Sequence, residues 1–226
     1  MRKQVRPFIL GVGLVLACGA AHAQPARERG ARCRAASLKY LGPSPDKEHL
    51  TEQEEYAYEY EQNRKYLRLC GNSDDNVTRS VRDSVAGYES TQTIARLFRA
   101  LRNAGSPESK DPNAYAALAA AYDVRRALLV SAYEQHEYKD PGVIAARNAS
   151  LEAAADLVVD AYARALAACG AGGRCQAEKA AWEKRLAELY TARHGGSAAG
   201  LRETIDGALG RPWPRPPLPW WLTDER

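Results

Sequence analysis

Residue types that commonly bind metals and cofactors are scarce in this chain of 226 residues. The single methionine is Met1, which excludes a methionine-rich copper site, and the absence of a Cys-x-x-Cys-His motif excludes covalent c-type haem. The four histidines form neither a Glu-x-x-His nor a His-x-x-x-His pair. Neither a phosphate-binding glycine loop nor a Gly-x-Ser-x-Gly motif occurs. We therefore expect a protein without a metal ion or cofactor.

Two further absences concern the fold and the membrane. No alternating run of β-branched residues predicts a strand, and alanine dominates the second half of the chain, which favours helices. The longest apolar run, from Phe8 to Ala17, is about half of the roughly 20 residues that a membrane-spanning helix needs. The sequence therefore predicts an all-α fold and no transmembrane segment in the mature protein.

The amino terminus has the parts of an export signal. Arg2, Lys3 and Arg6 precede the apolar run, and small residues continue as far as Ala23. We expect residues 1–23 to be a signal peptide that is cut before Gln24. Its removal takes away three of the formal charges of +4, and the nearly neutral remainder gives no reason to expect nucleic acid as a partner.

Cys18 offers a competing interpretation of the same region. The stretch from Leu14 to Cys18 resembles the lipobox of bacterial lipoproteins, in which the cysteine is acylated and becomes the first residue of the mature chain. We favour ordinary cleavage because Leu16 is unusual beside a lipobox cysteine and residues 21–23 form a good Ala-x-Ala site. The expected location is periplasmic or secreted. The alternative is a lipoprotein of the inner or outer membrane that faces the periplasm.

The other four cysteines would lie in an oxidising compartment, where disulfide bonds are the default interpretation. Cys169 and Cys175 flank a glycine-rich break, and a bridge between them would close a small loop that stabilises the fold by roughly 2 to 3 kcal/mol. Cys33 and Cys70 are then left for each other. Three connectivities are formally possible, so this second pairing follows only if the first is correct.

Apolar residues at helical spacing, with caps before them and glycine or proline after them, predict six helices. Two begin at the cap-plus-proline pairs Asp111-Pro112 and Asp140-Pro141. The turn between these two helices is short, which favours an antiparallel pair. The predicted helices cover residues 46–71, 77–101, 112–139, 141–169, 174–194 and 198–209.

These elements predict an antiparallel bundle of four to five helices stapled by disulfides. We divide the chain into the signal peptide, an irregular amino-terminal arm at 24–45, the bundle at 46–210 and a tail at 211–226. The tail is rich in proline and tryptophan, so polyproline II is its expected conformation.

Aromatic residues on the tail and the first predicted helix are the candidates for partner binding. Trp213, Trp220 and Trp221 are large rings on a segment that cannot continue a helix, and Arg215 adds charge. They either fill a groove of the bundle itself or dock the tail on a partner. Tyr58 points away from the packed tyrosines of its predicted helix, so it is a candidate contact residue.

One pair of residues resembles a catalytic motif. Glu89-Ser90 is similar to the Glu-Ser pair of lytic transglycosylases, in which the glutamate is the general acid. The accompanying Gly-Leu-Met-Gln segment is missing, and Glu89 lies inside a predicted amphipathic helix rather than at the end of one. A general acid also needs burial to raise its pKa, so a solvated helix surface is the better interpretation.

A second resemblance covers about a tenth of the chain. The segment from Cys169 to Leu189 is similar to the carboxy-terminal part of the LprI-like lysozyme-inhibitor domains, which are exported helical proteins with a cysteine pair followed by an Arg-Ile or Arg-Leu step. Arg185-Leu186 matches that step at a displaced spacing. The resemblance implies that such an architecture can serve as an inhibitor.

Three functions follow from these observations. The first is a non-enzymatic periplasmic protein that binds another protein, either as an inhibitor or immunity factor or as an accessory subunit of an envelope assembly. The second is a helical bundle that binds a small apolar ligand, with its tyrosine-lined seams as the wall. The third, which we favour least, is a cell-wall glycan hydrolase that uses Glu89.

Overall fold

The structure is a computed structural model that describes residues 28–43, 49–169 and 175–216. All regular elements within these ranges are helices and none is a strand, which confirms the predicted all-α fold. The contacts divide the chain into two compact units, Met1–Val85 (unit 1) and Ala86–Arg226 (unit 2). The bundle predicted for 46–210 thus includes parts of both units, and unit 1 has a core of its own made by Ala36, Tyr66, Cys70 and Val81. The division falls inside helix α3 (Asn76–Arg102).

Unit 1 contains a helix over residues 28–40, helix α2 (Glu52–Cys70) and the first part of α3. Helix α2 begins later than the predicted residue 46, because Thr51 and Glu54 form a capping box. The Thr51 hydroxyl accepts a hydrogen bond from the backbone N–H of Glu54 at 3.3 Å. The Glu54 carboxylate accepts one from the backbone N–H of Thr51 at 2.9 Å.

The helix at 28–40 differs from the irregular arm expected for this region. Its sequence from residue 31 onward lacks proline and glycine and is rich in alanine and arginine, which are strong helix formers. Ala36 is buried against Tyr66 and Val81, and Cys33 lies one turn earlier on the same helix. The Cα atoms of Cys33 and Cys70 are 5.5 Å apart in a disulfide bond, which fixes this helix to the end of α2.

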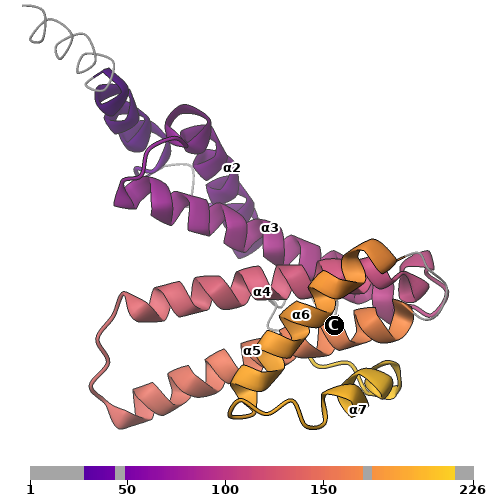
Figure 1. Cartoon of the computed structure of the whole chain (residues 1–226). Helices are drawn as coiled ribbons and strands as arrows, with labels where there is room; N and C mark the ends of the chain where they lie inside the picture. Colours follow the sequence, from indigo (N-terminus) through magenta and orange to yellow (C-terminus); the bar gives the residue numbers. More distant parts are fainter. Residues whose placement is uncertain (1–27, 44–48, 170–174, 217–226) are drawn as a thin grey trace, which may run out of the picture. The chain divides into compact units, whose positions relative to one another are not determined.

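Unit 2 is built around two long helices, α4 (Pro112–Glu134) and α5 (Pro141–Cys169), which run side by side and are joined by a short turn (Figure 1). Helix α6 (Gln176–Arg193) packs on α5, and so do the short helix α7 (Leu201–Asp206) and the 3-10 turn η3 (Ala208–Gly210). Another 3-10 turn, η2 (Pro107–Lys110), leads into α4.

The two long helices begin where the cap-plus-proline pairs predict. Asp111 accepts a hydrogen bond from the N–H of Asn113 at 2.9 Å, and Asp140 accepts one from the N–H of Gly142 at 2.7 Å. Helix α4 ends at Glu134, before the predicted residue 139, and His136 beyond it is exposed rather than part of an apolar seam. The residues after 134 make few buried contacts, so packing does not extend the helix.

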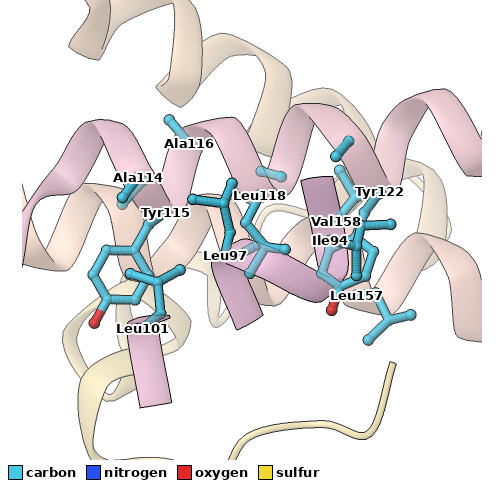
Figure 2. Packing of buried hydrophobic residues seen from close by; sticks show 14 of the residues in the cluster. Ile94, Leu97, Leu101, Ala114, Tyr115, Ala116, Leu118, Tyr122, Leu157 and Val158 are labelled. Carbon is cyan, nitrogen blue, oxygen red and sulfur yellow. The ribbon is translucent and has the colours of Figure 1, made fainter. Parts of the chain in front are cut away.

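The core of unit 2 lies between the second part of α3, α4 and α5 (Figure 2). Leu118 and Ala119 of α4 are fully buried, as is Val158 of α5, while Ile94 and Leu97 of α3 close one side. Many of the remaining core residues are alanines, which place little side chain between the helices and let them pack closely. This small-residue packing positions the side chains of the groove described below.

Helix α6 is held to the rest of unit 2 by two kinds of tie. Cys169 at the end of α5 and Cys175 before α6 form a disulfide with their Cα atoms 5.9 Å apart. Farther along α6, the Arg185 guanidinium binds the Asp123 carboxylate of α4 with a shortest distance of 2.6 Å, and Leu186 beside it is fully buried. Arg185 and Leu186 therefore both help to hold α6 on the rest of unit 2.

The two disulfides should differ in how much they stabilise the protein. On the chain-entropy account, the bond from Cys33 to Cys70 closes the longer loop, so replacing both cysteines by serine should lower the free energy of unfolding by about 4 kcal/mol, against about 2 kcal/mol for Cys169 and Cys175. Urea denaturation followed by circular dichroism measures both. Equal losses, or a larger loss at Cys169 and Cys175, would contradict the prediction.

Candidate binding groove

A groove of about 1010 Å³ lies in unit 2 between α4, α5 and the extended segment 211–215. We call it the α4–α5 groove. One wall comes from α4 with Tyr122, Arg125 and Leu129. The opposite wall comes from α5 between Ser150 and Asp160, which corresponds to a helix length of about 15 Å at 1.5 Å per residue. The groove is therefore long enough for an extended molecule.

Most of the groove surface is apolar. Leu129 lines the groove together with the small side chains of Ala153 and Ala154, and the buried Leu157 and Ile94 form the deeper part. Ala153 is exposed, Leu129 is half-buried and Leu157 is buried, so the groove deepens from its open side toward the core. Such a surface favours apolar groups of a ligand, because covering it removes apolar area from water.

The segment 211–215 forms one end of the groove, and a buried arginine holds it in place. Arg164 of α5 is only 1% exposed, yet its guanidinium donates to the carbonyl oxygens of Arg211 and Pro212 at 3.0 Å each and to the Asp160 carboxylate at 2.6 Å. Its guanidinium carbon lies 4.2 Å from the ring centroid of Trp213. A buried charge is tolerated only when it is paired and hydrogen-bonded, and these contacts satisfy both conditions.

Trp213 itself packs into unit 2. Its ring stacks on Tyr115 with centroids 5.9 Å apart and meets Phe98 edge-on at 5.6 Å. Aromatic pairs of this geometry contribute about 0.5 to 1.5 kcal/mol beyond the burial of their area. The ring is thus a component of the fold at the end of the groove, which fits the first of the two interpretations of the tail.

The carboxylates of the groove are all bound by arginines of the protein. Asp156 accepts from Arg193 at 2.9 Å, and Asp160 is shared by Arg164 at 2.6 Å and Arg211 at 3.3 Å. Because of these ion pairs, the negative charges of Asp156 and Asp160 are compensated within the protein itself.

The hydroxyl of Tyr122 is buried without a hydrogen-bond partner among the residues that the structure describes. The residue is 3% exposed and lies beside Ile94, Leu157 and Val158 (Figure 2). Burial raises the pKa of this hydroxyl above its ordinary value, the charge of Asp160 adds to that rise, and Arg164 opposes it. Tyr122 is therefore a neutral hydrogen-bond donor, and an unpaired buried donor costs about 1 to 3 kcal/mol.

The residues proposed from the sequence are distributed over both units. Trp213 and Arg215 line the α4–α5 groove, whereas Tyr58 lines a separate cavity of about 510 Å³ in unit 1 together with Tyr40. Trp220, Trp221 and Cys18 lie outside the described residues, so their predicted roles stay predictions.

Glu89, the candidate general acid, is exposed on α3. An exposed carboxylate on a helix surface lacks the enclosed setting in which a general acid meets its substrate. Its position therefore adds no support to hydrolysis.

Arg164, Tyr122 and Arg125 line or support the groove and were not predicted from the sequence. A signal for Arg164 exists, since it interrupts an alanine-rich run of α5 and follows Asp160 by one helical turn. Tyr122 and Arg125 carry no such local signal, because their importance depends on helices distant in the sequence.

Neither a metal site nor a membrane span is found in the described part of the chain. It contains no group of three or more histidine, cysteine, aspartate or glutamate residues placed to hold a metal ion. Within the same ranges, every helix is too short or too polar to cross a bilayer.

The chain matches no protein family, and neither a curated protein nor a solved structure shows significant similarity to it. The function must therefore be argued from the residues of the two units alone.

The anchor formed by Arg164 should be important for stability. In Arg164→Met, the carbonyls of Arg211 and Pro212 lose their donor and Asp160 loses its nearest cation, so the free energy of unfolding should fall by about 3 kcal/mol.

Arg202→Met is the matched control for urea denaturation. Arg202 is 91% exposed and 3.7 Å from Asp206, and removing such a surface pair should change stability by no more than about 0.5 kcal/mol. If both variants unfold at the same urea concentration, the buried anchor is not a source of stability.

Proposed function

We propose that this chain is an exported, non-enzymatic binding protein of the cell envelope, and that unit 2 holds a small apolar or amphipathic molecule in the α4–α5 groove. The observation that carries the proposal is the groove itself. Its volume of about 1010 Å³ lies at the upper end of the roughly 300 to 1,000 Å³ typical of small-molecule sites, and apolar walls with a few polar groups are characteristic of such sites.

Two further features support this proposal. Tyr122 and Tyr190 line the groove, so the seam of α4 with its neighbours supplies aromatic surface as expected for the wall of an apolar site. The export signal proposed for residues 1–23 and the two disulfides are consistent with an envelope location, where apolar molecules cross an aqueous space between membranes.

Filling the groove should weaken the binding of an apolar ligand. In Ala153→Trp the indole would occupy the space opposite Leu129, and because Ala153 is exposed the change should leave the fold intact. We expect the apolar fluorophore N-phenyl-1-naphthylamine to bind the native protein and to lose at least about tenfold in affinity for the variant, as measured by fluorescence titration.

Ala181→Trp is the control, because Ala181 is an exposed alanine of α6 that does not line the groove. Its affinity for the fluorophore should equal that of the native protein. Binding that survives Ala153→Trp, or an absence of binding to the native protein, would reject the groove as the site.

A protein-binding role has support from a different place, unit 1. Leu69 is 51% exposed and Val77 is 48% exposed, and both line a cavity of about 550 Å³ beside the disulfide of Cys33 and Cys70. Exposed apolar residues that share one concave surface mark contact sites for proteins. An envelope protein is the proposed partner, with this chain as its inhibitor or immunity factor or as an accessory subunit.

Pull-down from an envelope fraction can test this second role. Replacing Leu69 and Val77 by serine should remove a specific partner, whereas Val143→Ser, an equally exposed valine of α5, should retain it. A tail truncation in the same experiment should end after Pro216, because a cut after Gly210 would also remove Trp213 from the packed interior. A partner that is retained by the double serine variant would exclude this surface.

A further inference from the structure

The charged groups of the α4–α5 groove differ in whether they are paired with an opposite charge inside the protein. Asp156 and Asp160 are paired with arginines, as described above. Arg125 on the facing helix forms no ion pair with any carboxylate that the structure describes, although it lines the same groove. The uncompensated charge at the wall is therefore positive.

Arg125 is also held in position. Its Nη1 donates to the hydroxyl oxygen of Thr91 at 3.1 Å, and that hydroxyl donates in turn to the carbonyl of Gly87 at 2.7 Å. Thr91 is 1% exposed, so the guanidinium is fixed against a buried group of α3. Its other N–H groups have no protein acceptor among the described residues and are available to a ligand.

Tyr122 lies one turn before Arg125 on α4, so the two side chains are neighbours on one helical face. The hydroxyl of Tyr122 has no partner in the protein, and it can donate a hydrogen bond. A guanidinium without a carboxylate partner and an unpaired hydroxyl donor on one wall favour a ligand group that is anionic and accepts hydrogen bonds, such as a carboxylate or a phosphate.

We propose that the α4–α5 groove binds an amphipathic anion, with its acidic head on Arg125 and Tyr122 and its apolar chain along Leu129, Ala153 and Leu157. This inference rests on the proposed ligand-binding function and adds the class of ligand. The head lies at the level of Tyr122 and the chain extends toward Ser150, because the polar donors and the apolar wall occupy successive turns of α4. Since the Tyr122 hydroxyl is covered in the free protein, the side chains above it must move when the head binds.

Three probes built on an unbranched chain of twelve carbons separate the head from the tail: dodecanoate, dodecan-1-ol and dodecyltrimethylammonium. Calorimetric titration of the full-length protein should give an affinity for dodecanoate about tenfold higher than for dodecan-1-ol. The two ionic probes are kept below their micelle concentrations and dodecan-1-ol below its solubility limit. A single charge-assisted contact accounts for a difference of that size. The cationic probe should bind more weakly than either.

The variants assign this preference to named groups. Arg125→Gln should reduce the ratio of the two affinities from about tenfold to less than about twofold, and the control Arg202→Gln, which removes one exposed positive charge outside the groove, should leave it at about tenfold. Tyr122→Phe should lower the ratio while leaving the unliganded protein as stable as before or more stable, because it removes an unpaired buried hydroxyl.

The possible failures are distinguishable. If none of the three probes binds, the proposed function of the groove fails and the head-group assignment fails with it. If all three bind equally, or the cation binds best, the groove takes apolar chains but the anionic class is wrong. If dodecanoate is preferred and Arg125→Gln does not change the ratio, Arg125 does not hold the head.

Discussion

A single buried guanidinium links most of the features of unit 2. Arg164 is surrounded by α5, by the ring of Trp213 and by the backbone of residues 211–212, and its charge would be costly there without these partners. This cost is offset by the path of the segment after η3, which places two carbonyl oxygens against the guanidinium. That path makes one end of the α4–α5 groove, so the shape of the groove depends on the satisfaction of one charge.

The local elements of the fold could be predicted from the sequence, because their signals are local. Asp111-Pro112 and Asp140-Pro141 fix where α4 and α5 begin, and the glycine-rich break before Cys175 separates α5 from α6. The helix at 28–40 was missed because Cys33, Ala36 and Tyr40, which pack against the rest of unit 1, recur at helical spacing over only two turns. The division into two compact units has no signal in the sequence, because helical periodicity does not tell which helices pack together.

The groove could not be predicted, and the reason is again physical. Its wall combines Ile94, Leu129, Ser150 and Arg211, which are far apart in the sequence and meet only because of how α3, α4 and α5 are rotated about their axes. Periodicity shows which face of a helix is apolar but not which neighbour covers it. The sequence shows that the tail has tryptophan rings that need burial. It does not show that Trp213 packs on Phe98 and Tyr115, because these residues lie on other helices.

The alanines of the groove wall have an implication for how its specificity could diverge. Ala153 and Ala154 lie on the open side of α5, whereas the alanines that set the spacing of α4 and α5, such as Ala119 and Ala161, are fully buried. A change at the open alanines reshapes the space offered to a ligand without disturbing the helix packing beneath it. In the proposed function, the exposed alanine of the wall therefore bears on ligand choice, while the buried alanines of α4 and α5 bear on the stability of the fold.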